Sequence, residues 1–451
     1  MKLVIIGADA AGMSAASQAR RIDGTAEIIV LEKTQDVSYG ACGLPYKLPE
    51  GHRMADLQVV PVQKFREERR IDVRLEHEVT GIDLAAKKVT GTMPSGSFEV
   101  GYDRLIIATG ARVIRPPIEG LAEVWGRGAY PLKTLEDGRV LKAAIEASRP
   151  RRAVVIGGGY IGLEATENLR ELGAEVTVLE ALPDIVPFLP EKLRDRIRAE
   201  GEAHGVDIRC ETAVQQVKKR EDGTLEVLTG NGTFEADLII VATGVRPVNE
   251  LAVQAGIELG PAGAIAVDER MWTSAPDVLA AGDCADAVHG VSGRRVWIPL
   301  ALRANRGGKI AGANALGKDQ KAPPIMGTAV FKFFGLEIAR TGLTEKEAED
   351  AGFDPVTAII QAPTRAHYYP GGGKIQVALT GDRKTGRVLG AAMVGNEGAA
   401  HKIDTVVAAL SAGMTVAQVY DMDLAYAPPF GPSWSPLLTA ASALTKAMRR
   451  R

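Results

Sequence analysis

Two segments of the chain repeat the same order of elements, and this repeat constrains the fold more than any other feature. The apolar run KLVII leads into the turn GADAAG at residues 2–12, and AVVI leads into GGGYIG at residues 153–162. A helical stretch follows each turn, and a second apolar run then ends at an acid, Glu32 or Glu180. This order is typical of a βαβ dinucleotide-binding unit. We therefore predict an α/β chain with two Rossmann-like units.

Two further apolar runs, at residues 105–110 and 238–244, end in Ala-Thr-Gly, and each closes its unit. From about residue 325 the pattern changes to an antiparallel sheet with helices. The strands and helices expected there include residues 327–334, 375–380, 397–413 and 436–449. Together with the length of 451 residues, this suggests about three domains. The expected domains are a discontinuous first domain at residues 1–113 and 246–323, a second at 114–245, and a C-terminal α+β domain at 324–451.

The composition is that of a globular protein with a net charge of −2, which favours neither nucleic acid nor an anionic membrane as partner. Three cysteines, Cys42, Cys210 and Cys284, are too few for a disulfide scaffold and suggest a reducing compartment. No apolar stretch is long enough to span a membrane. We therefore expect a cytoplasmic protein, with no metal site.

Cys42 lies in the segment SYGACGLPY, residues 38–46, with no second cysteine within four residues. It is therefore not part of a paired-thiol redox centre. A lone redox cysteine can form a mixed disulfide with a small thiol or cycle through a sulfenic acid. Because the thiolate is the nucleophile and no basic side chain is adjacent in sequence, activation of Cys42 must come from the fold. A buried structural cysteine is the alternative.

These landmarks together resemble the flavoprotein disulfide reductases that carry two dinucleotide-binding domains. Within that superfamily, Cys42, the segment NRGG at residues 305–308 and the loop DLAYAPP at residues 423–429 resemble the group of coenzyme A disulfide reductases, NADH oxidases and NADH peroxidases. The closest likeness is to the NAD(P)H-dependent coenzyme A disulfide reductases. The resemblance implies FAD, NADH, a coenzyme A disulfide substrate and a homodimer built on the C-terminal domain.

The first glycine turn is expected to hold the FAD pyrophosphate at a helix N-terminus, and Glu32 to bind the ribose. Asp9 replaces the usual second glycine, which brings an anionic side chain to the position of close approach. Asp283 follows a strand end, where its carboxylate can bond the flavin ribityl chain or cap a helix. The full set expected at the FAD comprises Gly7, Ala8, Asp9, Ala10, Ala11, Gly12, Glu32, Lys33, Val79, Thr109, Gly110, Gly282, Asp283, Pro299, Leu300 and Ala301.

The second turn has the complete glycine pattern and is expected to hold the nicotinamide dinucleotide. Glu180 favours NADH over NADPH, because a carboxylate bonds a ribose 2′-hydroxyl and repels a 2′-phosphate, and the next three residues supply no arginine. Tyr160 is expected to cover the flavin face or, alternatively, to pack under its helix. The residues expected at the nicotinamide dinucleotide are Gly157, Gly159, Tyr160, Ile161, Gly162, Glu180, Thr243 and Gly244.

The helix after the first turn carries a polar face with a basic tip, since Ser14, Gln18 and Arg21 follow helical spacing. Further basic residues, Arg20, Lys64, Arg66, Arg69 and Arg70, add charge nearby. Arginine suits the phosphates of coenzyme A, although such a face is often simply solvated. By resemblance, the substrate-contacting positions are Ser14, Gln18, Arg21, Ser38, Arg70 and Asn305. Ala41 stands where some relatives carry a polar residue.

The resemblance also implies that the C-terminal domain of one subunit supplies tyrosines to the cysteine of the other. The matching positions are Tyr368 and Tyr426, with Tyr369 as an alternative to Tyr368 because the tyrosine is doubled. Such a tyrosine would protonate the departing coenzyme A thiolate. The alternative is that these are ordinary interface aromatics.

We therefore expect an enzyme that reduces coenzyme A disulfide, or a coenzyme A persulfide or polysulfide, with NADH through a Cys42–S–S–CoA mixed disulfide. A first alternative is an NADH oxidase or peroxidase that uses a Cys42 sulfenic acid. A second alternative, from another class, is a membrane-surface NADH:quinone dehydrogenase anchored by the segment at residues 437–451, whose end is basic. A redox sensor without enzymatic activity is a third.

Overall fold

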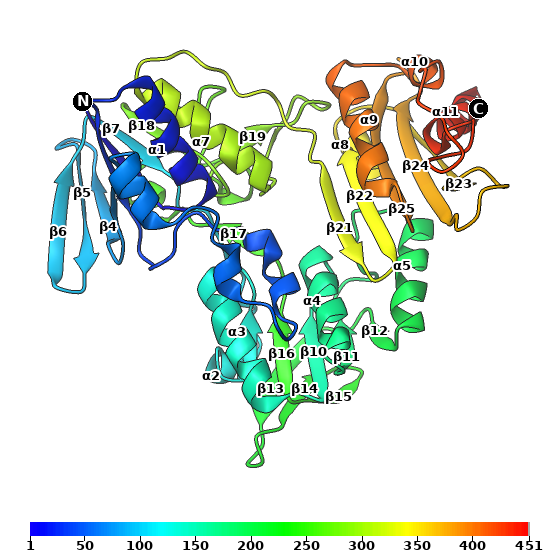
Figure 1. Cartoon of the computed structure of the whole chain (residues 1–451), viewed down its shortest axis with the longest axis horizontal. Helices are drawn as coiled ribbons and strands as arrows, with labels where there is room; N and C mark the ends of the chain where they lie inside the picture. The colour runs from blue at the N-terminus through cyan, green and yellow to red at the C-terminus, as the bar shows by residue number, and fades with distance from the viewer. Residues whose placement is uncertain (450–451) are drawn as a thin grey trace.

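The computed structural model describes residues 1–449, so the last two residues, Arg450 and Arg451, lie outside it. Figure 1 shows three parts joined in one molecule. The first contains the N-terminal helix α1 (Ala10–Ile22) together with α7 (Ala301–Ala315), which comes from much later in the chain. The second contains α3 to α5, and the third holds the C-terminal sheet with α9 to α11.

The first part is built on a parallel sheet whose strands come from both ends of its sequence. Its order is β18-β7-β1-β2-β3, with β1 (Lys2–Ile6), β2 (Glu27–Leu31), β3 (Asp72–Arg74), β7 (Arg104–Ile107) and β18 (Val278–Ala280). Strands buried on both faces read as continuous apolar runs, which is why the segments of β1, β2 and β7 stood out in the sequence, whereas the short edge strand β3 did not. A smaller antiparallel sheet holds β4 (Glu78–Asp83), β5 (Lys88–Met93) and β6 (Gly96–Gly101).

Helices α1 and α7 pack closely because α7 presents glycines to α1. A Cβ added at Gly308 would lie 2.2 Å from the carbonyl oxygen of Ala11, and one at Gly312 would lie 2.2 Å from that of Ala15. Larger side chains would separate the helices. The close approach at Gly308 and Gly312 therefore brings Asn305 next to the start of α1, where the Ser14 hydroxyl donates to Asn305 Oδ1 at 2.8 Å.

The second part repeats the parallel arrangement with a different sheet. Its order is β12-β11-β10-β16-β9, with β9 (Ala129–Pro131), β10 (Arg152–Ile156), β11 (Glu175–Leu179), β12 (Val206–Arg209) and β16 (Leu238–Val241). The helices of this part are α3 (Leu135–Ser148), α4 (Tyr160–Glu171) and α5 (Glu191–Ala203). The two predicted Rossmann-like units and the α/β class are thus confirmed.

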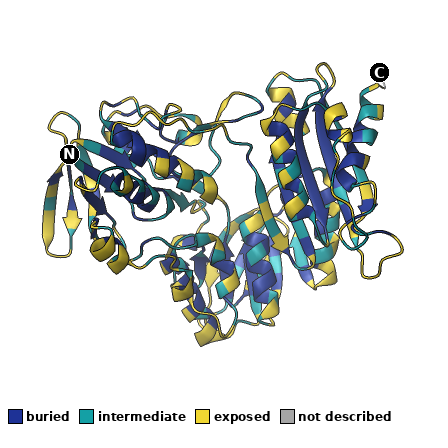
Figure 2. Ribbon diagram, turned by 45° about the horizontal axis from the view of Figure 1, so that its top comes forward, coloured by how far each residue is buried: buried dark blue, intermediate teal, exposed yellow. Residues whose placement is uncertain are grey.

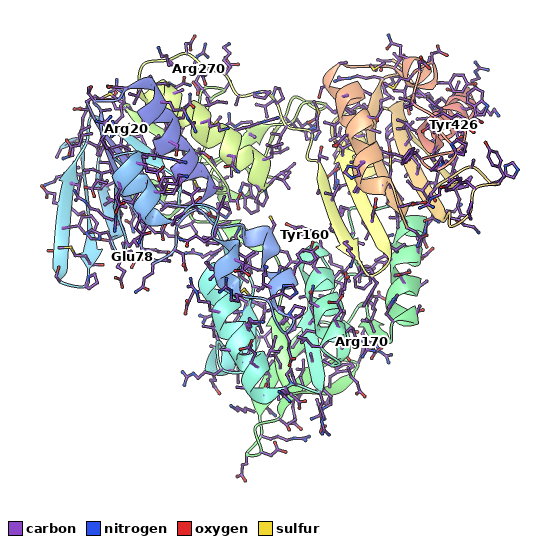
Figure 3. The ribbon with its side chains drawn as sticks, viewed as in Figure 1. Arg20, Glu78, Tyr160, Arg170, Arg270 and Tyr426 are labelled. Atoms are coloured by element: carbon purple, nitrogen blue, oxygen red, sulfur yellow. The ribbon has the colours of Figure 1, made fainter. Side chains whose placement is uncertain are left out.

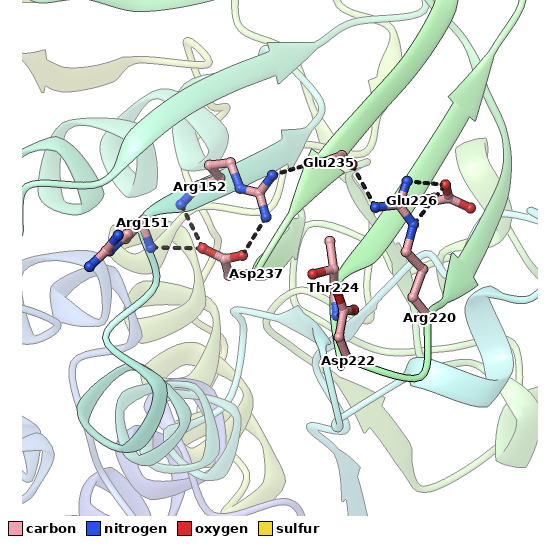
Figure 4. Close-up of polar contacts among 8 residues, drawn as sticks. All are labelled: Arg151, Arg152, Arg220, Asp222, Thr224, Glu226, Glu235 and Asp237. Carbon is pink, nitrogen blue, oxygen red and sulfur yellow. Dashed lines mark hydrogen bonds and ion pairs between the residues drawn. The ribbon is translucent and has the colours of Figure 1, made fainter.

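An antiparallel meander of β13 (Val214–Lys219), β14 (Leu225–Thr229) and β15 (Gly232–Ala236) extends the second part. Ion pairs attach it to β10 (Figure 4). Arg152 contacts both Glu235 and Asp237, and Arg220 contacts Glu226 and Glu235. These exposed pairs lie away from the glycine turns and contribute little stability individually.

The chain passes between the first two parts at one place. Strand β8 (Ala111–Val113) pairs antiparallel with β17 (Val245–Pro247). Hydrogen bonds flank this ladder on both sides, from the Thr109 hydroxyl to the Val248 carbonyl at 2.7 Å and from the Thr243 hydroxyl to the Ile114 carbonyl at 2.9 Å. The domain boundaries predicted near residues 113 and 245 fall at this ladder.

The third part is a five-stranded antiparallel sheet between helices, and Figure 2 shows its strands as a buried layer. The order is β21-β22-β25-β24-β23, with β21 (Ala329–Phe333), β22 (Leu336–Gly342), β23 (Pro355–Pro363), β24 (Lys374–Asp382) and β25 (Val388–Gly395). Its helices are α8 (Glu345–Asp350), α9 (Ala399–Ser411), α10 (Val416–Tyr420) and α11 (Pro436–Arg449). The strands and helices expected there are present, with ends shifted by a few residues.

The apolar side of α11 is used within the chain, because Leu437, Ala441 and Leu444 are buried in the same core as the strands β23 to β25. The described part of the segment 437–451 is thus a packed helix, and no apolar face is left for an interfacial anchor. No helix within residues 1–449 is long and apolar enough to cross a membrane.

The remaining elements are short: η1 (Ala41–Gly43), η2 (Pro45–Lys47), η3 (Met54–Leu57), η4 (Lys64–Glu68), α2 (Leu121–Val124), α6 (Glu250–Gln254), η5 (Pro261–Gly263), β19 (Ala287–Val288) and β20 (Arg295–Val296). Of these, η1 and η2 matter most for function, because they carry Cys42 and the residues that follow it.

Candidate active site

The two glycine turns have nearly the same backbone geometry. Gly7 and Gly157 adopt φ values of 104° and 111°, and a Cβ at either would lie within 2.5 Å of a carbonyl oxygen of the Ala-Thr-Gly strand end, Ala108 or Ala242. Only glycine accepts both the positive φ and this contact. The matched strand ends are therefore structural partners of the matched turns.

Each turn is also held by the acid at the end of its second strand. Glu32 Oε2 accepts from the Ala8 amide at 2.8 Å, and Glu180 Oε2 accepts from the Gly158 amide at 2.7 Å. The second oxygen of each carboxylate accepts from an amide two residues further along, Thr34 or Leu182. These bonds orient both carboxylates at the turns, and the predicted bonds from the carboxylates to a ribose remain predictions.

Asp9 occupies the N-cap position of α1 but makes no side-chain capping bond there. Its Oδ1 instead accepts from the backbone amide of Tyr39 at 3.2 Å, in the segment that leads to Cys42. Burial raises the pKa of Asp9 to about 6, while the Tyr39 amide and Lys133 act in the opposite direction. The anionic residue at the close-approach position is thus turned toward the cysteine segment.

The N-terminal amides of both helices are left without side-chain caps. Neither Asp9 at α1 nor Gly159 at α4 provides a capping bond, and the same holds for Leu300 at α7. Uncapped helix N-termini bind phosphate well, since their amides and the helix dipole favour negative charge. The chain's own residues therefore fit the two dinucleotides that the turns predict.

Asp283 follows Gly282 at the end of β18 and forms an ion pair with Lys133 at 3.1 Å. No helix in the described chain begins directly after residue 283, so the interpretation of Asp283 as a helix N-cap is wrong. Lys133, between β9 and α3, is a site residue that the sequence analysis missed. It lies 150 residues from its partner, and no local pattern marks it.

The Cys42 segment bridges the two dinucleotide-binding units. The Ser38 amide donates to the Ala8 carbonyl at 2.9 Å, which joins the segment to the first turn. Leu44 is buried in the core of the second unit, with Leu132 and Leu135. Cys42 itself, on the single turn of η1, is exposed to solvent. This places a solvent-exposed thiol where the two units meet.

The expected activation of Cys42 is only partly supplied by the chain. Although Cys42 is exposed at the surface of the chain, the protein packed around its sulfur partly desolvates the thiol and raises its pKa, and the charges of Glu164 and Asp283 raise that pKa further. Lys133 opposes them and favours the thiolate. The fold thus brings a cation to Cys42 from outside the cysteine segment. Tyr160, whose ring lies 6.2 Å from that of Phe331, belongs to the same group of interacting side chains.

Four of the predicted substrate residues line one pocket of about 170 Å³: Ser14, Arg21, Ser38 and Asn305. The other two do not line it. Gln18 accepts a hydrogen bond from Arg21 at 3.2 Å, and the Arg70 carbonyl accepts from Arg20.

The pocket also contains Arg69, which the sequence analysis had indicated as nearby charge, and two residues that it had not indicated, Phe65 and Lys309. Arg69 donates to the Ser17 hydroxyl at 2.8 Å. Lys309 follows Asn305 by one helical turn on α7, so helical spacing could have indicated it. Three cationic side chains thus surround a pocket at the start of α1.

Tyr368 and Tyr426 are brought together, and their hydroxyls lie 2.7 Å apart. Both side chains are exposed, and Figure 3 shows Tyr426 in the third part of the molecule, away from Tyr160. Tyr369 instead lies with its ring 5.9 Å from the guanidinium of Arg365. The pairing favours Tyr368 over Tyr369 as the partner of Tyr426, and their action in the other subunit remains a prediction.

Three further predicted positions make contacts within the protein. Val79 is buried in β4, and Thr109 and Thr243 bond the crossing segments as described. Cys284 is buried, as expected, and Cys210 is partly exposed.

Comparison with known proteins gives a consistent result. A family model described as pyridine nucleotide-disulphide oxidoreductase matches residues 1–308, and the dimerisation-domain model of the same name matches residues 328–436. The chain is 39% identical over 444 residues to the NAD(P)H coenzyme A polysulfide/persulfide reductase of Pyrococcus horikoshii, covering 98% of both. It is 34% identical over 450 residues to an NADH oxidase of Methanocaldococcus jannaschii, covering 99% of both.

Among solved structures, it is similar to a NAD-dependent persulfide reductase from A. fulgidus, with a TM-score of 0.95 and 37% identity. That similarity covers 99% of this chain and 83% of the other.

Proposed function

Because the chain belongs to the pyridine nucleotide-disulphide oxidoreductase family, we propose that it reduces coenzyme A disulfide, or a coenzyme A persulfide or polysulfide, with NADH through Cys42. Membership of the family makes the chain an oxidoreductase that uses FAD and a nicotinamide dinucleotide. The observation that carries the finer proposal is the position of Cys42. It lies where the two dinucleotide-binding units meet, on a segment whose Ser38 lines the basic pocket at the start of α1.

The bound groups have separate places in this proposal. The first turn, Glu32 and Asp283 would hold FAD, and the second turn and Glu180 would hold NADH. FAD and NADH, when bound there, would together supply two electrons to the sulfur of Cys42. The segments 1–113 and 246–323 would form the FAD domain, 114–245 the NAD domain and 324–451 the dimerisation domain.

The chain's own residues recognise the substrate and carry out the exchange. Arg21, Arg69 and Lys309 would bind the phosphates of coenzyme A, as cationic side chains commonly do. The Cys42 thiolate attacks one sulfur of the disulfide, the sulfur–sulfur bond breaks, and coenzyme A leaves as a thiolate. The product on the enzyme is a Cys42–S–S–CoA mixed disulfide. Names of relatives also support this substrate class.

The similarity to an NADH oxidase favours a second candidate. In that case Cys42 cycles through a sulfenic acid and the acceptor is oxygen or peroxide. Turnover of the anaerobically NADH-titrated enzyme with coenzyme A disulfide, oxygen and a quinone, side by side, separates the candidates. We expect the disulfide to be the best acceptor, and mass spectrometry of the isolated protein to show coenzyme A on Cys42. Faster turnover with oxygen and one added oxygen atom on Cys42 would favour the second candidate.

The dimerisation domain supports a homodimer, and we propose that Tyr368 and Tyr426 act on Cys42 of the partner subunit. Complementation tests this. Cys42→Ser protein and Tyr368→Phe/Tyr426→Phe protein are each inactive alone, but after subunit exchange a heterodimer contains one intact site. Recovered disulfide turnover is the expected result. Unchanged turnover by the double tyrosine variant would contradict shared sites. The sparse cysteines suit a cytoplasmic enzyme.

A further inference from the structure

Near Cys42 the structure places a carboxylate that the proposed mechanism does not use. The Tyr46 hydroxyl donates to Glu164 Oε1 at 2.8 Å. Tyr46, on η2, follows Cys42 by four residues, and Glu164, on α4, follows Tyr160 by four residues. The bond joins residues 118 positions apart in the sequence. It therefore links the cysteine segment of the first unit to the helix that begins at the second glycine turn.

The groups around Glu164 keep it poised between its two protonation states. Burial raises the pKa of Glu164 to about 7, the charge of Glu167 raises it as well, and the Tyr46 hydroxyl lowers it. Glu167 is engaged elsewhere, since its oxygens contact Lys332 and the Phe334 amide. Electrostatic interactions also connect Cys42 with Glu164, Tyr46 and Tyr160. Lys133 and Asp283 face Cys42 from the other elements packed there.

We propose that Glu164, acting through Tyr46, holds the proton that passes to the departing thiol when Cys42 attacks its disulfide. This inference rests on the proposed function and extends it. Glu164 is a positioning residue in this scheme, because it acts through its hydrogen bond with Tyr46 and not on the sulfur atoms themselves. It gives each subunit a proton source of its own, besides the tyrosines predicted to come from the partner.

The step balances without a further reagent. A bond forms between Cys42 Sγ and one sulfur of the disulfide, and the bond between the two substrate sulfurs breaks with its electron pair on the leaving thiolate. The Tyr46 hydroxyl gives its proton to that thiolate, and the Glu164 carboxyl gives its proton to Tyr46. Glu164 is left ionised, and Tyr46 then donates to it as in the structure. Solvent reprotonates Glu164, and NADH later supplies the two electrons that reduce the mixed disulfide.

The first test measures Cys42 without any disulfide substrate. The reduced, FAD-loaded enzyme is alkylated with iodoacetamide across neutral pH, and mass spectrometry follows the Cys42 peptide separately from those of Cys210 and Cys284. We expect an inflection near the pKa of Glu164, about 7, in addition to that of the thiol. Glu164→Gln should remove this inflection and move thiolate formation to lower pH, because the Glu164 charge raises the pKa of Cys42.

Two further variants sharpen the test. Tyr46→Phe should move the inflection to higher pH, since the Tyr46 hydroxyl lowers the pKa of Glu164. It also keeps the inference testable if Glu164→Gln loses its flavin. Glu171→Gln is the matched control, because it removes the same charge from an exposed position on the same helix. In turnover, Glu164→Gln should lose about 100-fold in kcat with coenzyme A disulfide, the lower end for general acid catalysis, with KM little changed.

Identical alkylation profiles for Glu164→Gln and Glu171→Gln would overturn the inference. Failure of the proposed function would look different. If coenzyme A disulfide is not a substrate, turnover is absent in every variant, whereas the pH profile of Cys42 alkylation still reports the coupling to Glu164.

Discussion

The first and second glycine turns begin with the same backbone geometry, and the middle glycine of the second turn, Gly159, is replaced by Asp9 in the first. A Cβ at Gly159 would meet no other atom within 4 Å, so the fold itself does not require glycine there. That glycine preserves open space at a helix N-terminus, as a dinucleotide needs. Asp9, in contrast, uses its side chain to hold the Tyr39 amide of the cysteine segment. The second turn therefore remains open to its ligand, whereas the first is hydrogen-bonded to the segment that carries Cys42.

The largest loss of activity is expected from substitution of Cys42. Its segment is bonded to the first turn, through the Tyr39 and Ser38 amides. Cys42→Ser should lower disulfide turnover by more than about 1,000-fold while NADH still reduces the flavin, because hydride transfer does not need the thiol. Stopped-flow absorbance of the flavin and steady-state disulfide assays measure the two steps separately. Substantial disulfide turnover by the variant would remove the thiol mechanism.

Gly159→Asp makes the second turn resemble the first. Because a side chain at this position meets no protein atom, the variant should fold and keep its FAD. The new carboxylate would occupy the space at the N-terminus of α4, and kcat/KM for NADH should fall by about 100-fold, close to 3 kcal/mol. Gly159→Ala, which adds only a methyl group, serves as the control and should lose less. Equal loss in both would show that shape matters here and charge does not.

Asp9→Asn keeps an acceptor for the Tyr39 amide but removes the charge. The folded-state pKa of Asp9 is raised to about 6, above the ordinary 3.8, so ionisation disfavours the folded FAD-free protein. Stability from this group is present below about pH 4 and is lost as the pH rises to about 6. Relative to wild type, the variant should gain about 2 kcal/mol above that window, after a discount for partial solvent exposure, and nothing below it. Thermal unfolding of FAD-free protein at several pH values measures this gain.

The smallest change in activity is expected at the strand-end acids, because both turns have one, Glu32 in the first and Glu180 in the second. Glu180 should give NADH at least a tenfold advantage over NADPH in kcat/KM, about 1.4 kcal/mol. Glu180→Gln should narrow the gap while keeping an acceptor for the Gly158 or Leu182 amide. Steady-state kinetics with NADH and with NADPH measure the two kcat/KM values. An enzyme that prefers NADPH would show that other residues hold the 2′-phosphate.

The sequence allowed the repeated units and the C-terminal sheet to be predicted because those features are local. Apolar runs, positive-φ glycines and strand-end acids each determine structure within about 30 residues. The pocket at the start of α1 was predicted in part. Helical spacing indicated Ser14 and Arg21, and the family resemblance added Ser38 and Asn305, whereas nothing in the local sequence indicated Phe65. Contacts such as Lys133 with Asp283 and Tyr46 with Glu164 join separate segments. No local pattern encodes them, so only the folded chain reveals them.

The ladder between β8 and β17 has a consequence for engineering. Val113 is the register partner of Val245, and Ala111 that of Pro247, so the chain leaves the first part and returns to it side by side. The stretch between these two strands, residues 114–244, therefore has adjacent ends. Domain insertion is best tolerated where the two ends of the inserted stretch lie close together. The second glycine turn and Glu180 both lie within this stretch. Replacing residues 114–244 with the corresponding stretch of a relative should change the preference between NADH and NADPH in a single step. The first glycine turn and Cys42 lie outside this stretch and would be unchanged.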